Sequence, residues 1–524
     1  MITVASFILV ALATYWFGFK EGFFSGVVHL VCVIVAGALA LAFWEPLAHT
    51  MLGIPSLREW AWGLSLLSLF SLLLLGLRVG TNLLIPDRQN YPHAVDVAGG
   101  VVTGLAIGIL TTGIGLIGIG FLPVGDLGGG FVRLQSKAGQ PGVKSQVPLP
   151  ATLTQSFYAS LSRGAFAPLT NADGLATAYP SLSRQAWGLQ RDTADKGRIE
   201  LAAAPGDLSV GTPYVGSFPG AAGDEYVVVP LSVSKEGFHR GATYVLSASQ
   251  THLVGDGTTP NVAFPKGWYE SGKLFLFDGL TNYATNTPGE QSIDLMLLFD
   301  RGDLGTQNAK SLMYKGLRLP LATASTEIAD LPLKGSGVRV AYDASAPVIP
   351  ATYLRADPAL GVIINKNSLP AGMEVQEGAI TEADGLDIPA KVSGTVNKSL
   401  RVDRLYQLPG TKLVKLDVSR GKSPVDIWGD SRREAGEDAP LVLVDSDGNT
   451  FTPVGWLHKQ ASSGFINVKL DPRTGVANVG LVPMLSSAGK DNLDLLFSIP
   501  AGRKIVAVKL GDITIGTSSL EVGD

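Results

Sequence analysis

Residues 93–120 read HAVDVAGGVVTGLAIGILTTGIGLIGIG, an apolar run with a single carboxylate, Asp96, near its start. Gly100, Gly104 and Gly108 follow that carboxylate at intervals of four. Glycine weakens an isolated helix, but in lipid a row of small residues lets two helix backbones approach closely. We therefore expect a membrane helix whose glycine face packs against another helix.

The composition is too apolar for an ordinary soluble protein, because the 524 residues have a mean hydropathy of +0.26 and only 16% are charged. Four stretches lack charge and are each long enough for a helix to cross about 30 Å of hydrocarbon. These are residues 2–19, 22–44, 60–77 and 97–125. The sequence predicts an N-terminal α-helical membrane bundle of four spans over residues 1–125, with the first span retained as an anchor and both termini on one side.

Six glycines repeat the four-residue spacing in this region, and we expect them to pack helices within one chain or between subunits, or to line a narrow passage. They are Gly18, Gly22, Gly26, Gly100, Gly104 and Gly108. Asp96 fits an N-cap of its own helix, because a carboxylate there satisfies free amides. Alternatively, Asp96 and His29 form a polar membrane site that binds an ion or relays a proton. His29 alone favours an interhelical hydrogen bond.

The segment from 126 to 220 has the composition of a juxtamembrane connector with short helices. Within it, ATLTQSFYASLSRGAF (151–166) places Leu153, Phe157 and Leu161 at helical spacing. This pattern predicts an amphipathic helix that lies on the membrane surface or contacts the domain that follows.

The remaining sequence contains an internal repeat with offsets of about 185 to 200 residues. The matched elements are a Val-x-Leu-x-Val alternation (229–233 and 414–418), NVAFPKGW with NTFTPVGW, SIDLMLLFDRG with NLDLLFSIPAG, and KGLRLPL with IVAVKLGD. Alternating apolar residues between turn residues indicate antiparallel strands with one buried face. We predict two tandem antiparallel β-sandwich domains, 221–330 and 401–524, joined by a β-rich bridging segment, 331–400.

Trp268 and Trp456 follow glycine at equivalent places in the two repeats, and core packing is the simplest interpretation. A ligand-binding surface is the alternative for both.

Motifs for catalysis, metals and nucleotides were sought, and the two nearest matches favour simpler interpretations. In WGDSRRE, Ser431 is followed by arginines instead of the glycines that would form an oxyanion hole. In VDSDGNTF, Asp445 and Asp447 fit a hairpin turn better than a calcium loop. We predict a protein that is not an enzyme and has no cofactor or metal. The net charge of −4 argues against nucleic acid as a partner, and Cys32 is the only cysteine.

The N-terminal motifs occur in an order that resembles one known family. GFKEG (18–22) forms a glycine-aromatic-basic turn, FWEPLA (43–48) follows the second span, and Asp96 opens the glycine series of the last span. Over roughly residues 1–125, this order is similar to the colicin V production protein (CvpA) family, whose name refers to export of a peptide toxin. The resemblance implies a multi-pass protein of the bacterial inner membrane, with its C-terminal domains in the periplasm.

These observations together favour a non-enzymatic envelope protein that displays tandem β-sandwiches outside the cytoplasm for binding a partner or the cell wall. The alternative is an oligomeric channel or secretion component with Asp96 in the membrane path. Membrane lipid and further copies of the chain, through the glycine faces, are the other expected partners.

Overall fold

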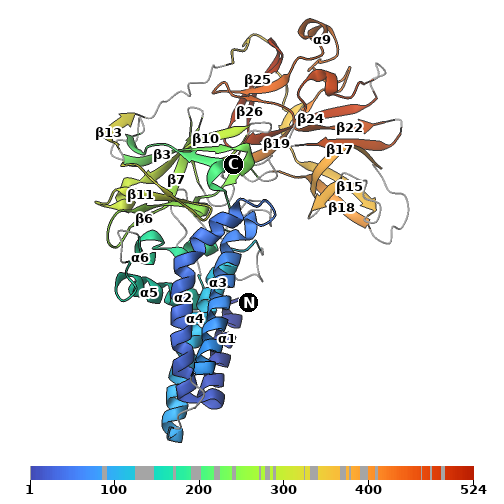
Figure 1. Ribbon diagram of the computed structural model, residues 1–524. Helices are drawn as coiled ribbons and strands as arrows, with labels where there is room; N and C mark the ends of the chain where they lie inside the picture. The colour runs from blue at the N-terminus through green and yellow to red at the C-terminus, as the bar shows by residue number, and fades with distance from the viewer. Residues whose placement is uncertain are drawn as a thin grey trace.

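A computed structural model of the chain shows a bundle of helices that carries a mainly β region at one end (Figure 1). It describes residues 2–84, 91–123, 147–168, 173–189, 202–217, 225–238, 244–270, 273–277, 284–286, 291–323, 325–330, 340–365, 373–376, 379–389, 399–407, 411–461, 463–471, 475–485 and 490–523. The predicted division into N-terminal helices and a mainly β remainder is confirmed. The first part of the predicted connector, up to residue 146, lies outside the described residues.

Four helices form the bundle: α1 (Ile2–Trp16), α2 (Gly22–Leu52), α3 (Ala61–Leu84) and α4 (His93–Gly120). Along α4, the contacts at Gly104 and Gly108 move back from Thr14 to Val10, so α1 runs antiparallel to α4. From Gly22 to Gly26 to Gly37 of α2, the facing residue of α4 moves forward from Asp96 to Thr103 to Ile114, so these two helices are parallel. The chain therefore reverses after a π-helical turn, η1 (Phe17–Glu21), at Gly22, whose φ of 81° suits glycine.

In the part of the chain that the structure describes, three helical stretches are long and apolar enough to cross a membrane: Ile2–Leu52, Arg58–Leu84 and His93–Gly120. The first of them contains both α1 and α2. Because α1 has only 15 residues, fewer than the roughly 20 that a spanning helix needs, the count of four spans stays a prediction.

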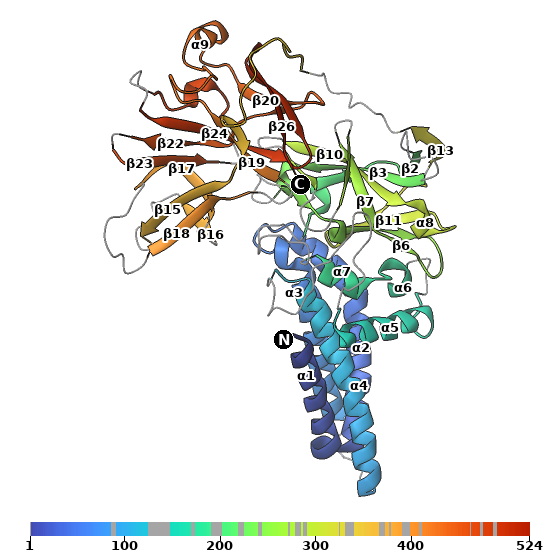
Figure 2. The same cartoon turned by 180° about the vertical axis from the view of Figure 1, so that it is seen from behind.

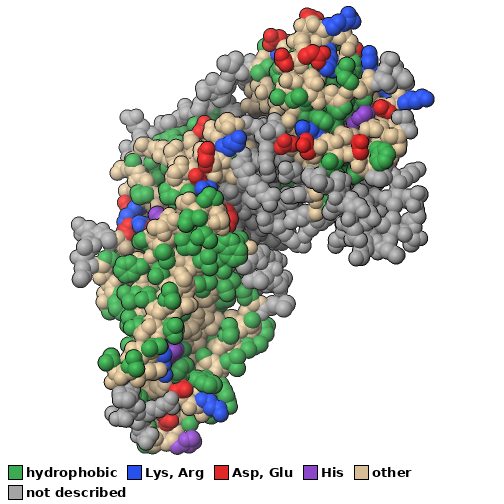
Figure 3. Space-filling model, turned by 45° about the vertical axis from the view of Figure 1, so that its right-hand side comes forward, with side chains coloured by type: hydrophobic (Ala, Val, Ile, Leu, Met, Phe, Trp, Pro, Cys, Tyr) green, Lys and Arg blue, Asp and Glu red, His purple; other side chains and the backbone are tan. Residues whose placement is uncertain are grey.

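Large apolar side chains point outward from these helices and form much of the bundle surface (Figure 3). Leu72, Leu83 and Val102 are 67%, 76% and 68% exposed. A soluble protein rarely exposes a continuous apolar surface of this extent, so the helical part is suited to contact with lipid.

Three shorter helices lie beside the bundle near the β region: α5 (Leu149–Arg163), α6 (Leu175–Ala178) and α7 (Leu182–Gly188) (Figure 2). Of the predicted apolar face of α5, Phe157 and Leu161 pack against the core of the bundle, whereas Leu153 is 44% exposed. Two polar side chains of α5 also meet the bundle: Tyr158 Oη donates to the Val33 carbonyl at 3.0 Å and Thr154 Oγ1 donates to the Ile109 carbonyl at 3.1 Å. The helix is thus fixed to α2 and α4, and part of its apolar face is left for other contacts.

The first β part contains two main sheets. One has the strand order β13-β2-β3-β10-β7-β8 with β1 beside β3, and the other has the order β12-β11-β5-β6. The strands are β1 (Leu208–Val210), β2 (Tyr214–Ser217), β3 (Glu225–Ser234), β5 (Thr251–Gly255), β6 (Val262–Ala263), β7 (Pro265–Glu270), β8 (Lys273–Leu276), β10 (Ser292–Asp300), β11 (Ala309–Tyr314), β12 (Leu317–Pro320) and β13 (Ser325–Asp330). A short pair, β4 (Val245–Leu246) with β9 (Ala284–Thr285), stands apart.

The second β part also has two sheets, with orders β14-β19-β24-β22-β23-β17-β18-β15, plus β16 beside β17, and β21-β20-β25-β26. The strands are β14 (Leu354–Ala356), β15 (Ala359–Asn365), β16 (Glu374–Gln376), β17 (Ala379–Pro389), β18 (Ser399–Leu405), β19 (Thr411–Asp417), β20 (Leu441–Asp445), β21 (Thr450–Phe451), β22 (Gly455–Gln460), β23 (Phe465–Leu470), β24 (Asn492–Pro500), β25 (Lys504–Leu510) and β26 (Ile513–Glu521).

The two β parts share a strand order, because β3-β10-β7-β8 in the first matches β19-β24-β22-β23 in the second. The register also matches: Leu231 lies opposite Leu295, and Leu416 lies opposite Leu495. One predicted match is wrong. KGLRLPL forms β12, which by sheet order corresponds to β26, whereas IVAVKLGD forms β25, which corresponds to β11. Two neighbouring strands with the same alternation of apolar residues made the mismatch possible.

Strand pairing differs from the predicted domain limits at two places. Strands β1 and β2 fall inside the predicted connector, 126–220, yet both pair with β3. The described strands of the predicted bridge, 331–400, pair with strands of the second β part, since β14 pairs with β19 and β17 with β23.

The hydrophobic cores show which parts are packed together. A single core contains Trp62 of α3, Ile114 of α4, Leu231 of β3 and Leu312 of β11, so it extends from the helices into both first sheets. The second β part has cores of its own, one of which joins Leu416 of β19 to residues of β20 and β25. The first β part is therefore packed onto the bundle as one body with it.

His252 of β5 is enclosed where the first sheets meet the α7 segment. Its Nε2 lies 3.3 Å from Ser181 Oγ, and its ring centroid lies 5.2 Å from that of Phe264. Burial, assisted by the charge of Arg184, lowers the pKa of His252 to about 3. In the folded protein this imidazole is therefore neutral at physiological pH.

We expect His252 to make the protein acid-sensitive. In the unfolded chain the pKa of His252 is about 6.5, so its imidazole binds a proton below that pH. In the folded chain the same imidazole is not protonated until about pH 3. The free energy of unfolding should fall by about 1.4 kcal/mol per pH unit below pH 6.5 from this group. The free energy of unfolding in urea, measured between pH 7 and 5 for wild type and His252→Asn, tests this. If it fell equally with pH in both proteins, the prediction would be wrong.

Candidate functional site

The six glycines singled out by the sequence all lie where helices of one chain meet. A Cβ on Gly104 would lie 2.9 Å from Thr14 Cα, and one on Gly108 would lie 3.0 Å from Val10 Cα. Gly100 faces the Phe17 carbonyl, and the other three, Gly18, Gly22 and Gly26, face Val101, Asp96 and Thr103 of α4. These positions have no room for a side chain, because backbones or packed side chains already occupy the space.

Asp96 does not cap its own helix, contrary to the N-cap prediction. Pro92 occupies the N-cap position of α4, and Asp96 lies one turn inside. Its Oδ1 accepts a hydrogen bond of 2.8 Å from the backbone amide of Phe23, in the first turn of α2. The first amides of a helix have no partner within the helix, so Asp96 caps a neighbouring helix instead.

We expect Asp96→Ala to cost about 1 to 2 kcal/mol of stability, the scale of a lost cap. Asp96→Asn keeps an acceptor oxygen and should cost well under 1 kcal/mol. Unfolding of both variants in mixed micelles measures the difference. An equal loss in both variants would mean that the charge, and not the hydrogen bond to Phe23, is what matters.

His29 is placed away from the Asp96 hydrogen bond. Its ring stacks on Phe17 of η1 with centroids 5.1 Å apart, and its Nδ1 is buried without a hydrogen bond. The expected interhelical hydrogen bond is therefore not made by Nδ1. Near it, Arg78 Nη2 donates to Ser25 Oγ at 2.9 Å, and that hydroxyl donates to Glu21 at 3.1 Å. Arg78 is part of α3, which continues beyond the predicted apolar stretch 60–77.

Both tryptophans of the repeat are buried, with exposures of 2% for Trp268 and 8% for Trp456. Trp268 stacks on Phe275 at 5.1 Å between ring centroids. Trp456 Nε1 donates to Asn467 Oδ1 at 2.8 Å. Neither indole is open to solvent as a ligand-binding surface would require.

The Asp445 turn is stabilised by hydrogen bonds and by an arginine. Asp445 Oδ1 accepts from the amides of Asp447 and Asn449 at 2.9 and 2.8 Å, and Arg503 lies 3.3 Å from both carboxylates. The same guanidinium lies 4.6 Å over the ring of Phe275, so it joins the two β parts. Among the described residues, no cluster of three or more His, Cys, Asp or Glu side chains could hold a metal.

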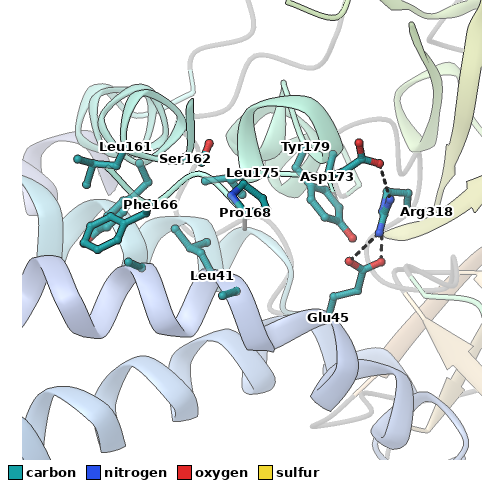
Figure 4. Close-up of a pocket in the computed structure, with 15 residues that line it drawn as sticks. Leu41, Glu45, Leu161, Ser162, Phe166, Pro168, Asp173, Leu175, Tyr179 and Arg318 are labelled. Atoms are coloured by element: carbon teal, nitrogen blue, oxygen red, sulfur yellow. Dashed lines mark hydrogen bonds and ion pairs between the residues drawn. The ribbon is translucent and has the colours of Figure 1, made fainter. Parts of the chain in front are cut away.

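A pocket lies between the bundle, α5, α6 and β12, with a volume of about 210 Å³ (Figure 4). Its walls differ in character from one end to the other. Leu41 of α2, Leu161 of α5 and Phe166 form an apolar end, and Phe166 is 47% exposed. The opposite end is charged, so the pocket is amphipathic.

Three charged groups form the polar end. Arg318 of β12 lies 3.4 Å from Glu45 of α2 and 3.3 Å from Asp173, which precedes α6. Asp173 also pairs with Lys310 of β11. Burial has the largest single effect on the pKa of Arg318 and lowers it, but the charges and hydrogen bonds of Glu45 and Tyr179 together outweigh burial and raise that pKa. The guanidinium is thus held charged between two carboxylates.

Two uncharged groups add hydrogen-bonding capacity to this end. The Tyr179 hydroxyl is buried and points towards Glu45 and Arg318 (Figure 4). Burial and the charge of Glu45 raise the pKa of Tyr179 well above its usual value, so the hydroxyl stays protonated and can act as a donor. Pro46 lies inside α2 and has no N–H, so the carbonyl of Ala42, which lines the pocket, lacks its helical hydrogen bond.

No protein-family model matches this chain, and no curated protein or solved structure matches it significantly. The resemblance to the CvpA family thus rests on the motifs of the first 125 residues alone.

The pocket residues were missed by sequence reasoning. Glu45 carried a signal, because it is the only Asp, Glu, Lys or Arg between residues 22 and 57 and it ends an apolar stretch. Asp173, Tyr179 and Arg318 stand in segments with no distinguishing pattern. Only the fold brings them to Glu45.

Proposed function

We propose that this protein is a non-enzymatic protein of the bacterial inner membrane that holds two tandem β-sandwiches in the periplasm to bind an envelope protein or the cell wall. The supporting observation is the continuous core between the helices and the first sheets. A protein that needed only an anchor could use a flexible linker. A packed junction fixes the height and direction of the β region above the membrane.

The junction is built from aromatic and charged contacts. Trp44 and Trp62 pack with ring centroids 5.3 Å apart, and Phe121 lies 5.4 Å from Trp44. Arg58, in the short 3-10 helix η2 (Arg58–Trp60) just before α3, pairs with Asp207 at 3.0 Å and also donates to the Glu236 carbonyl at 2.9 Å. Both partners of Arg58 belong to the first β part. Aromatic packing and the contacts of Arg58 therefore both hold this part against the helices.

A binding surface is best supported on the second β part. Leu481 and Met484 are 56% and 71% exposed and lie close together in sequence, at and just after a short 3-10 turn, η7 (Val479–Leu481). Two large apolar side chains exposed within four residues of each other suit contact with another protein.

Cross-linking in native membranes, with identification of the joined peptides by mass spectrometry, tests this function. We expect envelope components joined to the second β part, and their yield should fall strongly in Leu481→Ser combined with Met484→Ser. Val348→Ser, which changes a side chain that is 74% exposed elsewhere, is the matched control. Cross-links only to cytoplasmic proteins, or an unchanged yield in the double variant, would overturn the proposal.

Labelling of an introduced cysteine tests the proposed side of the membrane. Glu434→Cys places a thiol on α9 (Asp430–Ala435) at an exposed position, and the native Cys32 is buried. A membrane-impermeant maleimide should label this variant in cells with a permeable outer membrane but an intact inner membrane. Labelling only after lysis would place the β region in the cytoplasm.

The channel alternative has less support. It needs Asp96 in a membrane path, whereas the carboxylate is engaged with the Phe23 amide and packed against Gly22.

A further inference from the structure

We propose that the amphipathic pocket binds the headgroup of a zwitterionic phospholipid with a primary ammonium group, taken from the leaflet next to the β region. This inference rests on the membrane placement of the helices and not on the binding of a partner by the β parts. Three observations support it: the level of the pocket, its charges and its size.

The pocket lies at the level of the membrane boundary. A helix rises about 1.5 Å per residue, so the 21 residues from Gly22 to Ala42 span about 30 Å, the thickness of the hydrocarbon core. Glu45 is the first charge beyond that length. The apolar end, with Phe166 exposed, is suited to acyl chains, and the charged end lies on the side of β12 (Figure 4).

The charges complement a zwitterion better than an anion. Glu45 and Asp173 can accept hydrogen bonds from an ammonium, while Arg318 and the Tyr179 hydroxyl can donate to a phosphate. The contacts of 3.3 and 3.4 Å between Arg318 and its carboxylates are longer than the roughly 2.7 to 2.9 Å of a strong charged hydrogen bond. Arg318 and Glu45 therefore keep capacity for a ligand, and Asp173 keeps it on Oδ2, since its Oδ1 pairs with Lys310. A purely anionic headgroup would meet two carboxylates, and choline has no N–H to donate.

The volume sets how much of the lipid enters. At about 210 Å³ the pocket is smaller than the roughly 300 Å³ at which cavities begin to enclose whole small molecules. It can hold a headgroup while the acyl chains stay in the bilayer, beside α5.

Native mass spectrometry of the full-length protein, titrated with phosphatidylethanolamine, phosphatidylcholine or phosphatidylglycerol in detergent, tests the proposal. We expect phosphatidylethanolamine to be retained about tenfold more strongly than either other lipid, the scale of one charged hydrogen bond. Equal retention of the three lipids, or a preference for phosphatidylglycerol, would overturn it.

Three variants locate the effect. Ala42→Leu fills the pocket from an exposed position of α2 without touching the charges, and it should abolish the preference. Ala11→Leu makes the same change at an exposed position of α1 and should leave the preference intact. Glu45→Gln should lower the preference about tenfold while the protein stays folded, as checked by thermal unfolding. A preference that survives Ala42→Leu would also overturn the proposal, whatever cross-linking reveals about partners.

Discussion

Gly316→Ala is expected to lower the free energy of unfolding by about 3 kcal/mol and to loosen the β region from the helices. Gly316 has a φ of 89° in the turn between β11 and β12, where an L side chain costs roughly 1 to 2 kcal/mol. Its Cβ would also lie 2.7 Å from Cδ1 of Trp62. Trp62 is only 1% exposed and cannot move aside, so overpacking adds a further 1 to 3 kcal/mol.

A second glycine separates these two contributions. Gly385 has a φ of 64°, but a Cβ there would meet no atom within 4 Å. Gly385→Ala should therefore cost only the conformational part, about 1 kcal/mol. Denaturant unfolding followed by tryptophan fluorescence measures both variants. If both variants lost the same free energy of unfolding, Gly316 would not be packed tightly against Trp62. The proposal of a rigid junction between the helices and the β region would then be unsupported at this contact.

The helical part of the fold was largely predictable because lipid imposes a simple rule. A spanning helix needs a long run without charge, and such runs are visible directly in the sequence. The direction of each helix and the place of α5 were not visible. Tyr158 and Thr154 look like the polar side of an amphipathic helix, yet they are buried, since Gly37 and Gly113 leave room for them.

The β part was predictable where two copies could be compared. Matching alternations at 229–233 and 414–418 gave strands that have the same register in both copies. The prediction failed for the last strands, because apolar alternation identifies a strand but does not say which of two consecutive strands it is. Sheet order resolves this, and it depends on contacts between distant residues.

The candidate site was not predictable for a related reason. Glu45, Asp173 and Arg318 come from three segments, and more than 100 residues separate the last two. Asp96 shows the same limit on a smaller scale. A carboxylate near a helix start indicates a cap, but the sequence cannot tell that the capped helix is α2, 73 residues away.

Gly104→Leu is expected to cost about 3 kcal/mol or more, because it forces α1 and α4 apart. A Cβ at this position would lie 2.9 Å from Thr14 Cα and 3.0 Å from the Ala13 carbonyl. Both neighbours are backbone atoms, so no side chain can rotate to make space. In lipid the lost contact is not replaced by a hydrophobic gain, since lipid chains are as apolar as leucine.

Gly115→Leu in the same helix is the matched control. No atom lies within 4 Å of a Cβ there, so the new side chain should gain stability of up to about 1 kcal/mol from helix propensity. Unfolding in mixed micelles of increasing denaturing detergent, followed by circular dichroism, compares the two variants. If Gly104→Leu lowered the free energy of unfolding while Gly115→Leu raised it, the glycine face would be assigned to packing between α1 and α4 within one chain. A loss of oligomers without a loss of monomer stability in Gly104→Leu would instead assign that face to contacts between chains, and the packing of α1 against α4 would be wrong.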